Sequence, residues 1–163
     1  HRLIEDGGAE VRVGVSAAKV RFEIGTVKLT SKLIDGTFPD YGRVIPQGND
    51  KELKVSNAEF MSAVDRVSTI ASERGRAVKL NISPDRLILS VNNPDGGSAT
   101  EEIGVDYSAT PLEIGFNARY LLDIAGQLES SDVVFRLADS GSPTMVRDGA
   151  DESALYVLMP MRV

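Results

Sequence analysis

The stretch Asn57-Ala58-Glu59-Phe60 returns in altered form as Asn117-Ala118-Arg119-Tyr120. After each stretch, apolar residues continue at three- and four-residue spacing, which predicts an amphipathic helix. Each stretch begins with asparagine, whose side chain can accept a hydrogen bond from a free backbone N–H at a helix N-terminus. We therefore expect two similar helices, the first capped by Asn57 and the second by Asn117.

The segments around these helices repeat as well, because they alternate between apolar and polar residues as half-buried strands do. One short strand is expected before each helix, at residues 53–55 and 112–114. The strands expected after the helices lie at 78–83, 86–91 and 101–107 in one copy, and at 133–137, around Met145 and at 155–159 in the other. An earlier copy contributes strands at 11–16, 19–24 and 27–34. The repeated β-α-β-β-β pattern predicts an α+β fold in which helices cover one face of antiparallel sheets.

The pattern occurs in full twice, in a first repeat (residues 50–110) and a second repeat (residues 111–163). A polar link follows Pro46 and predicts a domain boundary, with an incomplete domain at 1–46 and a complete one at 47–163. The first five residues read as the last turn of a helix, which Asp6-Gly7-Gly8 would end. From this start we expect a fragment whose front part is missing.

The composition argues against several classes of protein. A net charge of -6 and a pI of about 4.8 argue against a simple basic nucleic-acid binder, so any DNA contact requires basic residues sorted onto one face. The only histidine is His1 and cysteine is absent, which argues against catalytic triads, metal sites and disulfides. Carboxylates are adjacent in the pairs Glu101-Glu102 and Asp151-Glu152, and because adjacent residues on a strand point to opposite faces, neither pair forms an obvious acid–base couple. We expect a cytoplasmic, non-membrane protein without catalytic site, metal or cofactor.

Two segments point to binding rather than to chemistry. Residues 35–46 join the two expected domains with two aromatic residues and two prolines, and they form either a stiff connector or a functional surface. Residues 156–163 are largely apolar, although chain ends are usually frayed and polar. Such a segment either completes the sheet of its own domain or lines a surface for a partner, a role that suits flexible methionines. The residues alone leave both interpretations open for each segment.

Three motifs in this chain together resemble a known family. They are Phe38-Pro39-Asp40-Tyr41 followed by Arg43-Val44, Glu113-Ile114-Gly115-Phe116-Asn117 followed by Tyr120, and Met159-Pro160-Met161-Arg162. Their order and spacing are similar to those of the beta subunit of bacterial DNA polymerase III, the sliding clamp. The resemblance implies a DNA clamp fold with three similar domains, of which residues 1–46 are the rear of the middle domain and residues 47–163 the third domain. It also implies a homodimer closed head to tail into a ring, with helices lining the hole and sheets outside.

The resemblance further implies a hydrophobic groove between the middle and third domains that binds short linear peptides. The implied partners are the polymerase III alpha subunit, the clamp loader, translesion polymerases, mismatch-repair proteins and initiation regulators. The implied groove residues are Pro39, Arg43, Val44, Asn117, Tyr120, Val157, Leu158, Met159, Pro160, Met161 and Arg162. The apolar members of this set would take leucine or phenylalanine anchors, and the polar members would hold the peptide backbone. Gly141 and Pro143 depart from the family's pattern, so we expect the second pocket of the groove to differ. His1-Arg2-Leu3 is similar to another groove motif of the family, but it lies too close to Phe38 to be equivalent.

Double-stranded DNA would pass through the hole, with sequence-independent contacts to phosphates. The candidate DNA-facing residues, on helix faces opposite the apolar stripe, are Arg2, Arg66, Arg74 and Arg119. The candidate ring-interface residues are Thr69, Ile70, Glu101 and Glu102, with the carboxylates facing basic residues of the neighbour. Ordinary solvated surface charge is the alternative for each arginine.

The main hypothesis is thus a non-catalytic processivity factor that encircles DNA. One alternative is a peptide-binding adaptor that uses the groove without encircling DNA. Another is a β-rich hydrolase or nuclease, which the scarcity of histidine and the lack of carboxylate clusters disfavour.

Overall fold

The computed structural model describes residues 10–71 and 77–163, and it divides into a smaller part, His1–Asp40, and a larger part, Tyr41–Val163. In the smaller part, β1 (Val11–Val15), β2 (Lys19–Ile24) and β3 (Val27–Lys32) form an antiparallel sheet in that order. The turn between β2 and β3 contains Gly25 at φ +56°, a left-handed conformation that glycine adopts without steric cost. The three predicted strands are confirmed, although β3 ends before residue 34.

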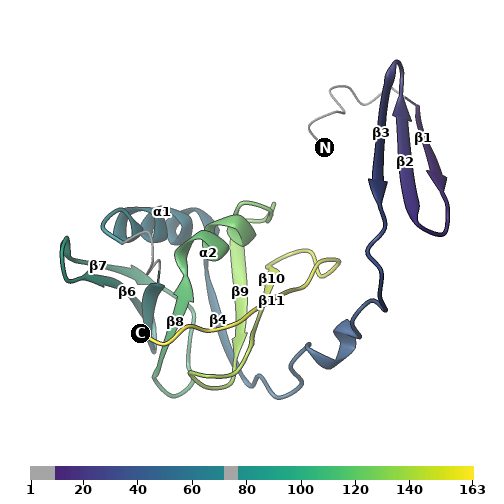
Figure 1. Cartoon of the computed structure of the whole chain (residues 1–163). Helices are drawn as coiled ribbons and strands as arrows, with labels where there is room; N and C mark the ends of the chain where they lie inside the picture. The colour runs from purple at the N-terminus through teal and green to yellow at the C-terminus, as the bar shows by residue number, and fades with distance from the viewer. Residues whose placement is uncertain (1–9, 72–76) are drawn as a thin grey trace. The chain divides into compact units, whose positions relative to one another are not determined.

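The larger part contains two four-stranded antiparallel sheets, two α-helices and one short 3₁₀ helix among its described residues (Figure 1). In chain order its elements are the 3₁₀ helix η1 (Tyr41–Arg43), β4 (Lys51–Ser56), α1 (Asn57–Ser68), β5 (Ala77–Ser83), β6 (Arg86–Asn93), β7 (Gly97–Gly104), β8 (Leu112–Asn117), α2 (Ala118–Ala125), β9 (Asp132–Leu137), β10 (Thr144–Asp148) and β11 (Tyr156–Leu158). Both helices lie on the same side of the sheets, where α1 packs against α2. The predicted α+β fold with two β-α-β-β-β repeats is therefore confirmed. Neither α1 nor α2, the helices within the described ranges, has the length and apolar character needed to cross a membrane.

The two repeats exchange their first strands. One sheet has the order β11-β10-β9-β4, so the three later strands of the second repeat share a sheet with the first strand of the first repeat, which pairs with β9. The other sheet has the order β7-β6-β5-β8, which is the reciprocal arrangement. Every residue of β4 is paired with β9, and every residue of β8 is paired with β5. Each sheet is therefore completed by the other repeat.

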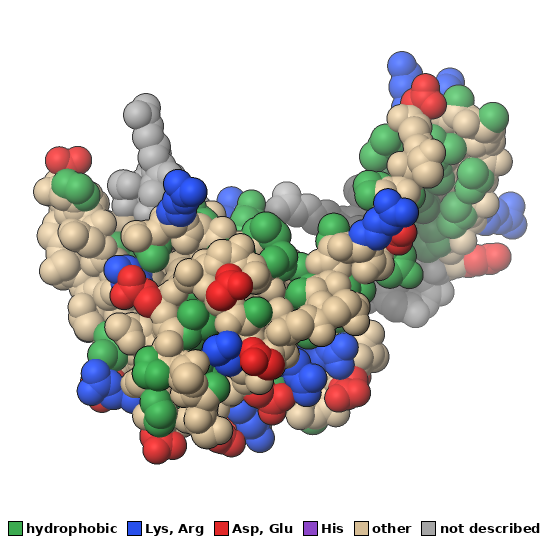
Figure 2. Space-filling model, turned by 90° about the horizontal axis from the view of Figure 1, so that it is seen from below, with side chains coloured by type: hydrophobic (Ala, Val, Ile, Leu, Met, Phe, Trp, Pro, Cys, Tyr) green, Lys and Arg blue, Asp and Glu red, His purple; other side chains and the backbone are tan. Residues whose placement is uncertain are grey.

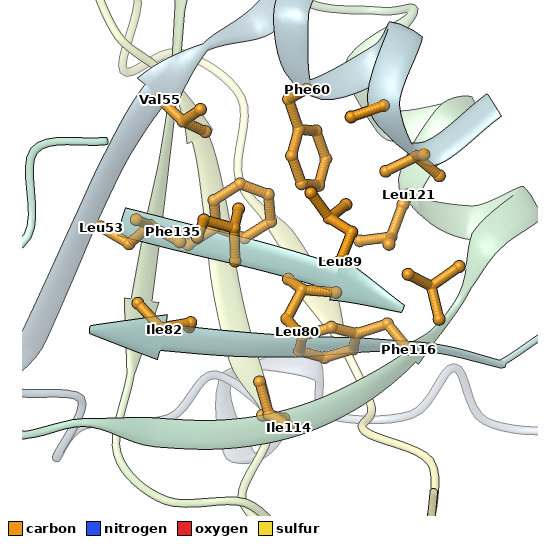
Figure 3. Close-up of a cluster of buried hydrophobic side chains, with 14 of the residues drawn as sticks. Leu53, Val55, Phe60, Leu80, Ile82, Leu89, Ile114, Phe116, Leu121 and Phe135 are labelled. Carbon is orange, nitrogen blue, oxygen red and sulfur yellow. The ribbon is translucent and has the colours of Figure 1, made fainter. Parts of the chain in front are cut away.

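The core of the larger part lies between the helices and the sheets (Figure 3). Phe60 of α1 meets Phe135 of β9 edge to face, with the ring centroids 5.2 Å apart. Leu121 of α2 and Leu89 of β6 extend into the same cluster, and Phe116 brings in β8. Full burial of one such side chain contributes roughly 1.5–3 kcal/mol. These contacts hold both helices against both sheets. They therefore fix the relative positions of the elements that carry the surface residues of the larger part.

The helix starts agree only partly with the prediction. Asn117 caps α2, because its Oδ1 accepts a hydrogen bond from the Arg119 N–H at 2.9 Å. The prediction that Asn57 caps α1 is wrong: Ser56 is the cap, and its Oγ accepts from the Glu59 N–H at 3.5 Å. Asn57 is the first helical residue, and its buried Nδ2 donates to the Ala125 carbonyl oxygen at 3.0 Å. It thereby joins the start of α1 to the end of α2.

The strand predicted at 101–107 runs from Gly97 to Gly104 instead. Asp106 lies beyond its end and forms a two-bond backbone bridge with Lys54, in which both N–H···O distances are 2.9 Å. Tyr107 is buried in the core, and its hydroxyl donates to the Thr110 carbonyl oxygen at 2.6 Å. The connector between β7 and β8, residues 105–111, therefore links the two sheets as well as the two repeats.

Candidate functional site

The segment Tyr156–Val163 contacts both sheets of the larger part. Its first residues form β11 and pair with β10, with Leu158 opposite Thr144. Further along, the Met161 N–H donates to the Gly115 carbonyl oxygen at 2.8 Å and forms an isolated bridge to β8. The interpretation that this segment completes a sheet of its own domain is therefore confirmed.

A cavity of about 650 Å³ lies beside the end of this segment, and we call it the tail cavity. It is lined by Glu113, Ile114, Gly115, Ser140, Gly141, Pro160, Met161, Arg162 and Val163. The lining thus combines apolar side chains with one cation and one carboxylate. A hollow that combines apolar and polar groups can hold the anchor side chain of a peptide while it fixes the peptide's orientation. Of the predicted groove residues, the structure brings Pro160, Met161 and Arg162 together here.

The loop between β9 and β10 shapes one side of the tail cavity through a single carboxylate. Asp139 Oδ1 accepts from the backbone N–H groups of Gly141 at 2.8 Å and Ser142 at 2.7 Å. Asp139 Oδ2 accepts from the Ser142 hydroxyl at 2.9 Å. These bonds, with the one from Gly141 foremost, lower the pKa of Asp139. The loop that carries Ser140 and Gly141 to the cavity is therefore held by an ionised side chain at neutral pH.

The other predicted groove residues of the larger part lie outside the described lining of the tail cavity. Met159 is 61% exposed, and Tyr120 on α2 is 55% exposed, so both offer apolar surface. Leu158 differs, since it is 5% exposed and packs in the core, where it supports the segment rather than presenting an anchor site. Val157 is half-buried opposite Met145 on β10.

The remaining predicted groove residues come from the segment that begins the larger part or from the smaller part. Arg43 ends η1, and Val44 follows it with 59% of its surface exposed. The Val44 N–H donates to the Tyr41 carbonyl oxygen at 3.1 Å. Pro39 is an exposed residue of the smaller part.

Sequence reasoning missed the wall of the tail cavity formed by Glu113, Ile114 and Gly115. Their signal was present in the resemblance motif, but only the asparagine and tyrosine that follow were assigned to the groove. Their role depends on the bridge between Met161 and Gly115, which joins distant parts of the chain.

A second region of interest is the contact between α1 and β7. The Arg66 Nε donates to Glu101 Oε2 at 2.9 Å, and a second, shorter bond joins the Arg66 guanidinium to Glu101 Oε1. The bond to Arg66 lowers the pKa of Glu101, and the bond to Glu101 raises the pKa of Arg66. A residue expected to face DNA is thus paired with one expected at the ring interface. Glu102 points elsewhere and lies 3.7 Å from the Arg86 Nε.

The other candidates of this region vary in their surroundings. Thr69 is exposed at the end of α1, whereas Ile70 is partly buried and packs against the core. Arg119 on α2 lies 3.8 Å from Asp123 in an exposed ion pair. The predicted DNA-facing residues Arg2 and Arg74 lie outside the described residues. A cavity of about 580 Å³ has residues of α1 and β7 in its lining, which consists of Ala58, Glu59, Ser62, Arg66, Glu102, Ile103 and Gly104.

The charges of the larger part are mixed on the face turned away from the helices. Figure 2 shows basic and acidic side chains interspersed over this face rather than gathered into one basic area. Within residues 10–71 and 77–163, no group of three or more His, Cys, Asp or Glu side chains is placed to hold a metal ion.

Comparison with known proteins identifies similar chains along nearly the whole sequence. The family model of the DNA polymerase III beta subunit, C-terminal domain, matches residues 42–162, and the model of the central domain matches residues 1–40. The beta sliding clamp of Caulobacter vibrioides is 54% identical over 162 residues, and that of Escherichia coli K12 is 38% identical over the same length. Both alignments cover 99% of this chain and 44% of the relative, so the chain spans less than half the length of these relatives.

Solved structures give the same result. The beta sliding clamp of Caulobacter crescentus is 54% identical with a TM-score of 0.91, and the alignment covers 99% of this chain and 44% of that one. A sliding clamp from Bartonella birtlesii, solved bound to griselimycin, is 58% identical with a TM-score of 0.87 over 94% of this chain and 41% of that one.

Proposed function

The chain belongs to the family of the DNA polymerase III beta subunit, the bacterial sliding clamps, and on this premise we propose that it is the rear portion of a ring that tethers a polymerase to duplex DNA. The observation that carries the proposal is the exposed Met159 next to the tail cavity with Pro160, Met161 and Arg162 in its lining. In this proposal residues 1–46 are the rear of the middle domain and residues 47–163 are the third domain. The relatives are named sliding clamps, which supports a non-catalytic role, and the proposal includes a cytoplasmic location.

The proposed groove binds linear peptides of the polymerase III alpha subunit, the clamp loader, translesion polymerases and repair proteins. Exposed apolar residues such as Met159, Tyr120 and Val44 favour docking, since their contact with a partner removes apolar surface from water. Methionine side chains adapt to anchors of different shape, which suits a site with several partners. Arg162 adds an exposed cation that can hold a polar or acidic peptide group.

Titration of griselimycin into the chain tests the groove, because this compound is bound to a sliding clamp of the same family. Replacing Met159 and Met161 by alanine together should weaken binding by about tenfold or more, the effect of losing one apolar anchor contact. Met61→Ala is the matched control, because Met61 lies on α1 and does not line the tail cavity. Equal affinities for the wild type and the double variant in calorimetry would count against the groove.

The proposed ring forms when α1 and β7 meet the neighbouring subunit. β7 lies at the end of its sheet, so its outer edge offers backbone N–H and C=O groups for pairing. Thr69 is exposed at the end of α1, and residues of α1 and β7 line a cavity in the same region. Glu102, more exposed than Glu101, offers a carboxylate to basic residues of the neighbour.

Sedimentation of the full-length protein tests this interface. Thr69→Arg should convert dimers into monomers, while Ser108→Arg, on an exposed connector, should leave dimers intact. Thr69 is a better probe than Ile70, because a charge at Ile70 would also disturb the core. Persisting dimers of Thr69→Arg would refute the interface.

For DNA, the proposal places α1 and α2 toward the hole, with Arg119 and Arg66 near the phosphates. Both helices lie on one side of the sheets, which supports a common inner face. A full-length ring should stay on a nicked circular duplex and slide off after linearisation. A peptide-binding adaptor, the alternative, would show no dependence on DNA topology.

A further inference from the structure

Gly115 lies in the middle of β8, in a position where the strand has no room for a side chain. Its neighbours Ile114 and Phe116 are core residues, at 1% and 0% exposure. Gly115 is itself buried, and it is paired through β8 with Lys79 of β5. It thus has β5 on one side and receives the bridge from Met161 as a second partner.

The space above Gly115 is filled by the end of the segment Tyr156–Val163. A Cβ placed on Gly115 would lie 2.3 Å from Val163 Cγ1, 2.7 Å from the Met161 carbonyl oxygen and 2.9 Å from Val163 Cγ2. Such approaches are far shorter than the 3.5–4.0 Å at which carbon atoms pack. The backbone of Gly115 is not in the left-handed region. Glycine is therefore needed at this position because there is no room for a side chain, and not because of its backbone conformation.

The crowded atoms belong to residues that form a wall of the tail cavity. Met161, Arg162 and Val163 all line it, and Gly115 lines it from the opposite strand. The pairing of β11 with β10 ends at Leu158, and the hydrogen bond from Met161 to Gly115 fastens the residues beyond. The crowding around a Cβ at Gly115 cannot be relieved by movement of a flexible side-chain end alone, because one of the three near atoms, the Met161 carbonyl oxygen, is backbone.

We propose that Gly115 is a positioning residue for the peptide groove: the space left by its missing side chain seats residues 161–163 so that Met161 and Arg162 line the tail cavity. The inference rests on the proposed function, since it assumes that the tail cavity receives a partner's side chain. It adds a residue that the groove needs although it offers the partner no side chain. An alanine at this position would move the wall of the site and leave the apolar core of the larger part in place.

Two measurements on the 163-residue chain test this role in Gly115→Ala. The first is amide hydrogen exchange at Met161, whose N–H is protected in the wild type by the bond to Gly115. The second is griselimycin affinity by calorimetry. We expect faster exchange at Met161, unchanged protection in the strands β5 and β9, and affinity lower by about tenfold or more.

The matched control is Gly48→Ala, which makes the same chemical change where an added Cβ would meet nothing within 4 Å. A second comparison adds Val163→Ala to Gly115→Ala, because this removes two of the three close atoms. We expect the double variant to recover part of the Met161 protection and affinity that Gly115→Ala loses, and Val163→Ala alone shows what loss of the valine does by itself.

The outcomes separate this inference from the proposed function. A wild-type chain that does not bind griselimycin would refute the groove itself, whatever the exchange data show. A Gly115→Ala variant with full Met161 protection would refute the proposal that Gly115 positions residues 161–163. Faster exchange at Met161 with unchanged affinity would show that ligand binding does not depend on the placement of residues 161–163 by Gly115, and would refute the positioning role.

Discussion

The guanidinium of Arg66 on α1 and the carboxylate of Glu101 on β7 form a two-bond ion pair that ties a helix to the edge strand of a sheet. The Arg66 side chain is 60% exposed and that of Glu101 is 24% exposed. An exposed pair of this kind contributes little to stability by itself, because water and salt screen its attraction. Its larger effect is on charge, since the positive charge of Arg66 is already matched before any DNA phosphate approaches.

The first prediction concerns the titration of Glu101. Arg66 lowers its pKa below the ordinary value of 4.5. A lowered folded-state pKa means that the pair stabilises the fold above the unfolded-state pKa and loses this effect as the pH falls through the folded-state pKa. In Arg66→Gln the Glu101 pKa should rise toward its ordinary value in an NMR titration. Arg86→Gln, which removes the partner of Glu102, should leave the Glu101 pKa where it was.

The second prediction concerns Asp148, a buried carboxylate between two loops. Its oxygens accept from the backbone N–H groups of Glu129, Ser130, Ala150 and Asp151 at 2.9–3.1 Å. The Ser130 hydroxyl and then the backbone N–H groups of Ala150, Ser130 and Glu129 hold the pKa of Asp148 well below its usual range.

Asp148→Asn should therefore lower the melting temperature at pH 7, because an amide nitrogen cannot accept two of these bonds. The carboxylate's stabilising effect is complete above the unfolded-state pKa and disappears as the pH falls through the lower folded-state pKa. Melting curves of the two proteins should accordingly converge in strong acid. Asp123→Asn, in an exposed pair on α2, should melt close to the wild type throughout. A constant gap between Asp148→Asn and the wild type down to low pH would contradict this account.

The third prediction concerns the aromatic contact in the core. Phe60→Ala removes a side chain that is 1% exposed and touches Phe135. It should lower the free energy of unfolding by about 3–5 kcal/mol, the usual loss for a buried phenylalanine. Phe38→Ala, at a side chain that is 81% exposed, should change it by no more than about 0.5 kcal/mol. Urea denaturation followed by circular dichroism measures both, and similar losses for the two variants would contradict the core assignment.

The fourth prediction separates two roles of Asn117. Its side chain caps α2, and it was also predicted to hold a bound peptide. Asn117→Ala should cost about 1 kcal/mol of stability through loss of the cap. Asn117→Ser keeps a capping oxygen, so it should retain the stability of the wild type but lose griselimycin affinity if the amide contacts the ligand. Full affinity in Asn117→Ser would limit Asn117 to the structural role.

The repeat and its strands could be predicted from the sequence, because amphipathic periodicity is a local property. The start of α1 shows where local reasoning ends. Ser56 and Asn57 are both good capping residues, and the choice between them depends on Ala125, which accepts the Asn57 amide from 68 positions away. The exchange of β4 and β8 between the repeats is also invisible to periodicity, since alternation identifies a strand without identifying its neighbour.

The candidate site could likewise be predicted only in part, because some of its contacts join residues that are far apart in the sequence. Pro160, Met161 and Arg162 came from the family resemblance, and all three line the tail cavity. Gly115 belongs to a resemblance motif but was not assigned to the groove, because a glycine within a strand carries no chemical signal until the chain that packs on it is known. The pairing of Arg66 with Glu101 likewise spans 35 positions and joins two residues that sequence reasoning had placed in different surfaces.

The exchange of first strands bears on how such a chain could originate. A single β-α-β-β-β copy would keep one open sheet edge and one strand with no partner, so it would be a poor solitary protein. Two separate copies could satisfy each other by swapping that strand, as domain-swapped dimers do. The larger part has this arrangement within one chain, joined through residues 105–111. A gene duplication followed by fusion would thus have preserved an existing dimer. If the chain is cleaved within residues 105–111, the two resulting fragments should reassemble into the same fold.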